Sequence, residues 1–355
     1  MPNKGVDKSP VRLAIIGCGA VTEICHLPAI KLAPEVEIVA LVDKNIARAE
    51  SLGKQFGVEF CTEDYRRLPE NVDGVVVALP HYLLAPVSIE FLERGIPVLV
   101  EKPMALSLNQ AEAMVKAAAD NDVALQVGLK FHFCQGTRLV KRAIDEGWLG
   151  VLQSFSLEWG FVYDWPVASG FFFNKEQAGG GVLIDLGSHA LDLLLWWMGD
   201  AVEVEYRDDS QGGVEAECEL SLLMQAPTGP VPGTVALSRL RQLSDTARIV
   251  GEHFTIECDL ATPDRVRIWP NTSNGKDLAF ELAPGAASGQ SWDDMYAEQL
   301  RAFARVIVAR STPVVPGERV LSSMALLDQC YRERRPLELP WMRHAVSPRR
   351  ESVSA

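Results

Sequence analysis

The sequence predicts an α/β protein with two domains, a parallel sheet first and a large, mostly antiparallel open sheet second. Over about the first 130 of 355 residues, short apolar runs alternate with helical patterns, which is typical of parallel strands covered by helices. From about residue 150, apolar and polar positions alternate between turn residues, which is typical of antiparallel strands with one solvated face. We therefore expect one domain over residues 1–130, a second over 131–340 and a flexible tail over 341–355.

The first domain is predicted from short, mostly apolar runs and from helices that follow them. Such runs are typical of strands that are buried on both faces. Strands are expected at residues 11–16, 36–42, 72–79, 96–100 and 123–128. Helices are expected at residues 46–56, 83–94 and 108–120.

The second domain is predicted from alternation, with a turn over residues 227–233. Strands are expected at residues 151–159, 202–206, 215–223, 234–240, 247–250 and 254–258. Helices are expected at residues 139–146, 182–198, 292–309 and 318–332, the last two packing back on the first domain.

A glycine-rich turn, Gly17-x-Gly19-x-x-Thr22, follows the first strand and opens a helix. Glycines permit a tight turn and the close approach of a pyrophosphate to the helix N-terminus. Asp43 ends the second strand, where a carboxylate accepts hydrogen bonds from a ribose 2′-hydroxyl and repels a 2′-phosphate. This context predicts a Rossmann domain that binds NAD, although the adjoining Lys44 leaves NADP open. The residues expected to contact the cofactor are Gly17, Gly19, Ala20, Val21, Asp43, Lys44, Leu79, Pro80, His81, Glu101 and Lys102.

Two opposite charges end the buried run of residues 96–100: Glu101 and Lys102, followed by Pro103. In open α/β sheets, ligands bind beyond the carboxyl ends of the strands. Lys102 is therefore the first candidate for chemistry. The alternative is an exposed ion pair where the strand ends, which is common and weak.

A second group of polar residues follows three glycines, at residues 179–181, which we expect to form a flexible lead into an otherwise apolar helix. Asp185 and His189 are four residues apart and so are expected on one helical face, which Asp192 extends. A carboxylate beside an imidazole can hold its tautomer and stabilise its charged form, as acid–base catalysis requires. The alternative is a core histidine with satisfied partners. No third ligand has a metal-site spacing, so no metal is expected.

Together these motifs resemble the Gfo/Idh/MocA oxidoreductases over residues 11–198. The resemblance implies NAD(H) or NADP(H), sugar or cyclitol substrates, Lys102 as the catalytic lysine, and Asp185 and His189 as the rest of the site. His132 stands where many members carry arginine, and His81 where many carry asparagine, which leaves the substrate class open. The tentative substrate contacts are His132, Trp159, Tyr163 and Asp185. Trp159 and Tyr163 lie in the aromatic-rich stretch 159–173, which is equally compatible with lining a sugar pocket and with core or interface packing.

The predicted reaction is hydride transfer between a secondary alcohol of a sugar, sugar derivative or cyclitol and NAD(P), with Lys102 or His189 as the base. The alternatives are a NAD-dependent glycosidase that acts by transient oxidation and a NAD-binding sensor without turnover. A small molecule (a sugar, nucleotide sugar or polyol) is therefore the expected partner. The resemblance also implies a homodimer or homotetramer.

Composition narrows the partners and the location. The net charge is −13, which argues against nucleic acid as a main partner. Seven cysteines without a CxxC motif suggest neither a disulfide framework nor a zinc site. The longest apolar stretch, residues 190–198, is too short to cross a membrane, and the polar N-terminus does not resemble a signal peptide. We expect a cytoplasmic protein.

Overall fold

The computed structural model describes residues 9–166, 169–272, 278–282 and 292–338, so the predicted tail at 341–355 lies outside the described residues. The first sheet has six parallel strands in the order β3-β2-β1-β4-β5-β6. They are β1 (Val11–Ile16), β2 (Val36–Val42), β3 (Phe60–Thr62), β4 (Gly74–Val77), β5 (Val98–Val100) and β6 (Leu125–Val127). This order confirms the predicted Rossmann sheet, whose strand order reverses between β1 and β4 and leaves a binding crevice at their carboxyl ends.

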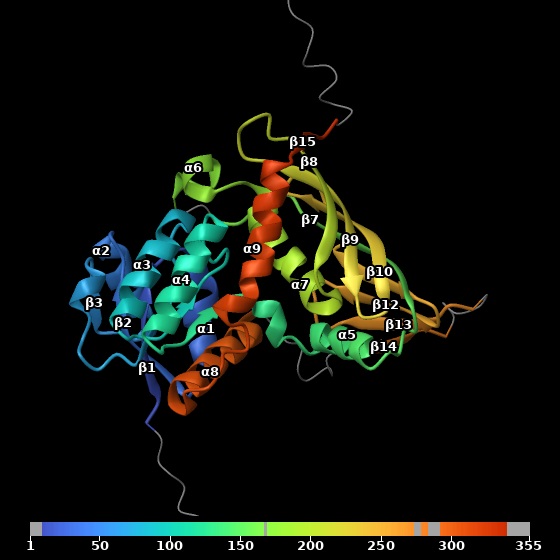
Figure 1. Cartoon of the computed structure of the whole chain (residues 1–355). Coiled ribbons are helices and arrows are strands. Elements are labelled where there is room, and N and C mark those ends of the chain that lie inside the picture. The colour runs from blue at the N-terminus through green and yellow to red at the C-terminus, as the bar shows by residue number, and fades with distance from the viewer. Residues whose placement is uncertain (1–8, 167–168, 273–277, 283–291, 339–355) are drawn as a thin grey trace, which may run out of the picture.

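Helices cover both faces of this sheet (Figure 1). They are the π-turn η1 (Thr22–His26), α1 (Leu27–Ile30), α2 (Ile46–Phe56), the 3₁₀ turn η2 (Tyr65–Arg67), α3 (His81–Glu93) and α4 (Leu108–Asp120). The expected helix at residues 83–94 begins at His81 instead, directly after Pro80. β3 was not predicted, because three residues with an exposed Phe60 do not form an apolar run.

The second sheet has nine strands in the order β14-β13-β12-β11-β7-β10-β9-β8-β15. They are β7 (Leu152–Gly160), β8 (Ala201–Asp208), β9 (Glu217–Ala226), β10 (Gly229–Ser238), β11 (Thr246–Gly251), β12 (Phe254–Asp259), β13 (Val266–Pro270), β14 (Phe280–Leu282) and β15 (Arg335–Pro336). Only the β7–β10 and β8–β15 pairs are parallel, so the predicted mostly antiparallel sheet is confirmed.

The expected turn over residues 227–233 is wrong in extent, because β10 already begins at Gly229. Pro230 and Pro232 pair with β9, whereas β7 joins β10 only from Gly233. The start of β10 is therefore an edge segment, where a proline without an N–H is tolerated. Two prolines and two glycines within five residues resemble a turn in sequence although the chain is extended.

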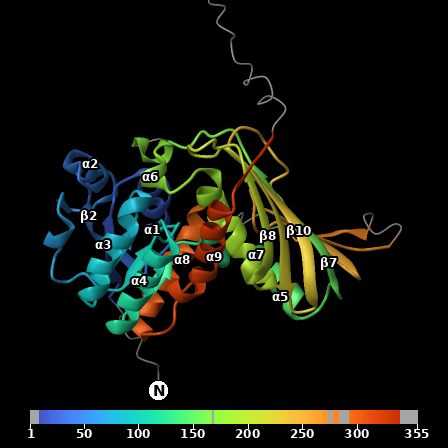
Figure 2. The same ribbon diagram turned by 45° about the horizontal axis from the view of Figure 1, so that its top comes forward.

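Of the helices of the second half, α7 and α9 lie between the two sheets (Figure 2). The helices of this half are the 3₁₀ turn η3 (Lys130–Phe133), α5 (Gln135–Asp145), the 3₁₀ turn η4 (Gly170–Phe173), α6 (Lys175–Ala178), the π-helical turn η5 (Leu183–Gly187), α7 (Ser188–Met198), α8 (Trp292–Ala309) and α9 (Gly317–Arg332). α8 packs on α1 and β1, and α9 lies between α4 and α7. The late helices thus return to the first sheet and join it to the helix that follows η5.

The stretch Lys175–Met198 has the length and apolarity of a membrane-crossing helix, but 83% of its most apolar window is buried inside the protein. Its apolar side chains pack between α9, α5 and the second sheet. This burial is that of a core helix.

Candidate active site

The glycine turn after β1 has the geometry that a bound pyrophosphate requires. Gly17 has a φ of +106°, and a Cβ there would lie 2.2 Å from the Ala78 carbonyl oxygen. A Cβ at Gly19 would meet nothing within 4 Å, so this side of the turn is open to a ligand. The Thr22 hydroxyl donates to the Gly17 carbonyl oxygen at 2.6 Å, which explains how threonine replaces the third glycine of the motif. The turn therefore fits a dinucleotide phosphate at the N-terminus of η1.

The Asp43 carboxylate is hydrogen-bonded to the backbone of this turn. One carboxylate oxygen accepts from the Cys18 backbone N–H and the other from the Asn45 backbone N–H, both at 2.8 Å. Lys44 is exposed. Arg48, one turn further on, pairs with Glu23 at 2.8 Å and donates to the Cys18 carbonyl oxygen. The Asp43 carboxylate is thus held at the carboxyl end of β2, where a ribose would lie.

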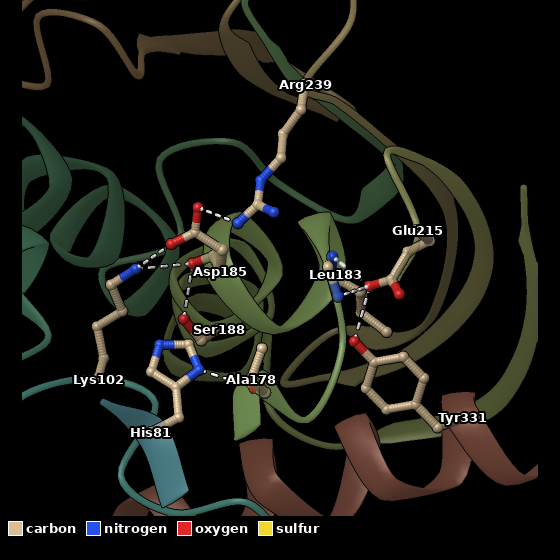
Figure 3. Close-up of polar contacts among 10 residues, drawn as sticks. His81, Lys102, Ala178, Leu183, Asp185, Ser188, Glu215, Arg239 and Tyr331 are labelled. Carbon is tan, nitrogen blue, oxygen red and sulfur yellow. Dashed lines mark hydrogen bonds and ion pairs between the residues drawn. The ribbon is translucent and has the colours of Figure 1, made fainter. Parts of the chain in front are cut away.

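Lys102, Asp185 and Arg239 form an ion-pair cluster between the two domains (Figure 3). Lys102 Nζ lies 2.6 Å from one Asp185 carboxylate oxygen and 3.1 Å from its carbonyl oxygen. Arg239, at the end of β10, donates to the other carboxylate oxygen at 2.7 Å. Burial opposes ionisation of Asp185, but the charges of Lys102 and Arg239 outweigh it and hold the pKa of this carboxyl well below its usual range.

The glycine-rich entry to η5 is closely packed, not a flexible lead. A Cβ at Gly180 would lie 1.9 Å from the Tyr331 hydroxyl oxygen, and one at Gly181 would lie 1.9 Å from the Glu215 carbonyl oxygen. The Glu215 carboxylate accepts from the backbone N–H groups of Gly181 at 2.8 Å and Leu183 at 3.0 Å (Figure 3). The Tyr331 hydroxyl donates to it at 2.8 Å. Glu215 therefore takes up the first free N–H groups of the turn that carries Asp185.

Asp185 and Asp192 have partners other than His189. Asp185 lies in the π-helical turn η5, and His189 lies in α7, which continues it. Asp185 instead pairs with Lys102 and Arg239, while Asp192 pairs with His132 at 2.5 Å. The Nε2 atom of His189 lies 3.4 Å from Lys130 Nζ, and its Nδ1 has no hydrogen-bond partner among the described residues. Burial, Lys130 and Lys102 lower the pKa of His189 well below its ordinary value.

Two functional candidates were missed by the sequence analysis: Lys130 and Arg239. Lys130 is the first residue of η3, just beyond β6, so the rule that ligands bind at the carboxyl ends of strands could have identified it. Its amine is buried, and burial together with the nearby Lys102 lowers its pKa to about 8. Arg239 and Asp185 are 54 residues apart in the sequence, so no local sequence pattern predicts their contact.

Two other predicted cofactor residues have buried partners. His81 Nδ1 lies 2.8 Å from the Ala178 carbonyl oxygen, and burial lowers the pKa of His81 to about 4, so its neutral ring donates to α6 (Figure 3). Glu101 lies 2.9 Å from His26 Nε2. Burial opposes its ionisation, but the hydrogen bond from His26 and the charges of Lys102 and Lys130 together outweigh burial and lower the pKa of Glu101.

The three aromatic candidates for substrate contact differ in their surroundings. His132 is 1% exposed and bound to Asp192, and Trp159 is 5% exposed against Phe131, so this packing does not support a substrate contact for either. Tyr163 is different, because its hydroxyl is buried without a partner among the described residues and Arg239 lies 5.0 Å over its ring. Burial, and then the Asp185 charge, raises the pKa of Tyr163.

All seven cysteines are free thiols. Within the part of the chain that the structure describes, no three His, Cys, Asp or Glu side chains are grouped so that they could hold a metal ion.

A six-stranded dinucleotide-type sheet with a lysine at its carboxyl edge, paired with an aspartate from a second, open-sheet domain, defines a class of two-domain nicotinamide-dependent proteins. Residues 11–129 match the family described as an oxidoreductase family with an NAD-binding Rossmann fold, and residues 137–257 match the GFO/IDH/MocA C-terminal domain. The chain belongs to the GFO/IDH/MocA family, which confirms the resemblance stated from its sequence.

Individual relatives are similar over part of the chain. A putative UDP-kanosamine synthase oxidoreductase subunit of Amycolatopsis mediterranei is 34% identical over 54% of this chain and 52% of its own length. D-glucoside 3-dehydrogenase of Escherichia coli is 31% identical over 55% of this chain and 56% of its own length. These matches therefore span about half of each relative.

Several solved structures agree over nearly the whole chain. One of them is the aldose-aldose oxidoreductase of Caulobacter crescentus complexed with glycerol, with a TM-score of 0.80 and 22% identity over 92% of this chain and 97% of that protein. At this identity the likeness shows the shared fold.

Proposed function

We propose that this chain is an oxidoreductase that transfers a hydride between a secondary alcohol of a sugar, sugar derivative or cyclitol and NAD(P). The contact of 2.6 Å between Lys102 Nζ and the Asp185 carboxylate carries the proposal. It brings the carboxyl edge of a dinucleotide-type sheet against a polar turn of the second domain, where a substrate can meet a nicotinamide. The names of the glucoside and aldose relatives support a carbohydrate as the substrate.

The residues of the site divide the chemistry among them. A dinucleotide held by the turn at residues 17–19 and by Asp43 would supply the hydride acceptor. Lys102, held by Asp185, donates a hydrogen bond to the alcohol oxygen and stabilises its developing negative charge. His189, neutral because burial and neighbouring cations lower its pKa, accepts the hydroxyl proton. The C–H electron pair leaves as hydride, the O–H proton goes to His189, and a carbonyl remains.

Orientation of the substrate is proposed to come from two buried polar atoms close to Asp185. The Tyr163 hydroxyl and the Arg239 Nε have no hydrogen-bond partner among the described residues. A buried polar atom without a partner costs free energy, and hydroxyl groups of a sugar would remove this cost. The proposed oligomer and the cytoplasmic location stay predictions.

The test is a screen of myo-inositol, D-glucose, D-xylose and methyl D-glucoside with NAD and NADP, followed through the absorbance of the reduced cofactor. Asp43 predicts a preference for NAD. Lys102→Met and His189→Ala should each lower turnover by about 10²–10⁴. Lys116→Met is the matched control, because its side chain is 73% exposed. Turnover within about tenfold of the unmodified protein in both site variants contradicts the assignment, and a preference for NADP contradicts the role of Asp43.

A further inference from the structure

We propose that Lys130 is a positioning residue that acts through His189: its amine fixes the histidine tautomer and exchanges the substrate proton with it. The inference rests on the proposed function, since it concerns the base of that reaction. It assigns a role to a second buried lysine, which the hydride transfer described above does not use.

The placement of Lys130 shows that its amine is part of the site. Its Nζ lies 3.4 Å from His189 Nε2, which is within hydrogen-bond distance although longer than usual. The side chain is 4% exposed, and its Nζ lies 4.9 Å from the centre of the Phe131 ring and 5.9 Å from that of Tyr296. Aromatic faces attract a cation but do not replace water around it. Burial therefore makes the loss of this charge easier than it is in water.

The groups that face the pair come from several elements. Around Lys130 these are Glu101 and Lys102 beyond β5, Cys25 of η1, Cys134 before α5, His189 of α7 and Tyr296 of α8. Those that act on His189 are Lys130, Lys102, Asp185 and His132. Glu101 favours the charged form of Lys130, but burial and the Lys102 charge outweigh it, and the pKa of Lys130 falls to about 8. The amine therefore changes its charge within the ordinary working range of an enzyme.

The charge of Lys130 determines the tautomer of His189. An ammonium group has only donors, so at neutral pH His189 Nε2 must accept from Lys130 and the ring proton lies on Nδ1. In this state the Nε2 lone pair is occupied and cannot take up another proton. Once Lys130 is neutral, Nε2 is free to act as a base, and the neutral amine beside it can receive the proton.

The proton steps balance. During alcohol oxidation, His189 Nε2 takes the hydroxyl proton and passes it to the neutral Lys130 amine, which becomes an ammonium while His189 becomes neutral again. In carbonyl reduction the same ammonium returns its proton through His189 to the oxygen. Oxidation therefore requires neutral Lys130 and reduction requires charged Lys130. The two directions should show opposite pH dependences around pH 8, the pKa given above.

The first experiment needs no substrate. The full chain, labelled with ¹³C-lysine and ¹⁵N-histidine, is titrated by NMR from pH 6 to pH 10. One lysine signal should titrate near 8, about two pH units below an ordinary lysine, and should be absent from Lys130→Met. The His189 signal, assigned with His189→Gln, should show the Nδ1–H tautomer below this pH and a changed tautomer ratio above it. If no lysine titrates below about 9.5, or if the His189 signal is constant through this range, the inference is wrong.

The second experiment measures pH–rate profiles in both directions, with the sugar or polyol identified by the screen. For oxidation, kcat/KM should rise to a plateau above about pH 8, and for reduction it should fall. Lys130→Met should lower the oxidation kcat by about 10²-fold, the low end of what an acid–base group supplies, and should remove both pH limbs. Lys130→Arg, which stays charged, should oxidise slowly at every pH and should retain more of the reduction rate. Lys116→Met, on the exposed face of α4, is the control.

These outcomes separate the inference from the proposed function. Loss of activity in Lys130→Met with both pH limbs unchanged would indicate a purely structural role and overturn the inference. Circular dichroism shows whether the variant is folded. If the screen finds no substrate, the proposed function fails, while the NMR titration still decides whether Lys130 and His189 form the pair.

Discussion

The contact between Gly180 and Tyr331 predicts a strong coupling between two residues that are 151 positions apart in the sequence. In Gly180→Ala, the new Cβ would lie 1.9 Å from the Tyr331 hydroxyl oxygen and 2.5 Å from the ring carbon that bears it. Ordinary contacts between nonbonded heavy atoms are about 3.5 Å, so the ring must move by about 1.5 Å. That displacement breaks the Tyr331–Glu215 hydrogen bond of 2.8 Å.

The cost has two parts. Overpacking in a closely packed region costs about 1–3 kcal/mol, and a lost hydrogen bond costs about 1 kcal/mol. We therefore expect Gly180→Ala to lower the free energy of unfolding by about 3 kcal/mol. In the background of Tyr331→Leu the ring is absent, and the same substitution should be neutral or slightly stabilising, since alanine restricts the unfolded chain by about 0.4–1 kcal/mol.

The assay is a double-mutant cycle of Gly180→Ala and Tyr331→Leu, measured by urea unfolding and by turnover. The matched control is Gly170→Ala, where a Cβ would meet nothing within 4 Å. The coupling energy should be about 3 kcal/mol. Turnover (kcat) should also fall in Gly180→Ala, because the displaced turn carries Asp185. The Asp185 backbone N–H donates to the Gly181 carbonyl oxygen. An equal cost of Gly180→Ala in both backgrounds would refute the reasoning.

Two further predictions concern the charged groups of the site. Asp185→Asn leaves the Lys102 and Arg239 charges without their shared carboxylate. It should lower the free energy of unfolding, measured with urea, by about 3 kcal/mol. A change below about 0.5 kcal/mol would show that water solvates the charges of the cluster. Lys130→Met should raise the free energy of unfolding by up to about 3 kcal/mol at pH 7. The pKa of Lys130 is about 8 in the folded protein and 10.5 as an ordinary lysine, so below pH 8 the folded protein bears the full cost of burying the ammonium, which methionine removes. This gain should shrink as the pH rises from 8 to 10, and a gain independent of pH would contradict the burial of the charge.

Much of the first domain could be predicted because its signals are local. The mostly apolar runs at residues 11–16 and 36–42 coincide with β1 and β2, where most side chains are buried and the charged Arg12 and Glu37 lie near the start of each strand. Lys102 could be identified because a charge directly after such a run must lie at the carboxyl edge of the sheet. The sequence around Pro230 and Pro232 resembles a turn, but these residues belong to β10. They pair with β9 on one side only, and such an edge segment tolerates proline.

The partners of the site residues could not be predicted from local pattern. Asp185 was singled out through its four-residue spacing to His189, but its carboxylate pairs with Lys102 and Arg239. These contacts span 83 and 54 residues and depend on how the two sheets pack. The glycines before η5 were interpreted as flexible because their neighbour, Tyr331, is distant in sequence.

The distribution of charge explains why any pH dependence near neutrality should originate at Lys130. Lys102 and Arg239 both pair with the Asp185 carboxylate. Asp185 stays ionised, because its two cationic partners hold its pKa well below the usual range, and it balances Lys102 at 2.6 Å. His189 stays neutral for the opposite reason, since burial and the neighbouring ammonium groups lower its pKa. Lys130 is buried like these groups, but its pKa is lowered only to about 8, so its proton can be gained and lost while the charges that orient the substrate stay constant.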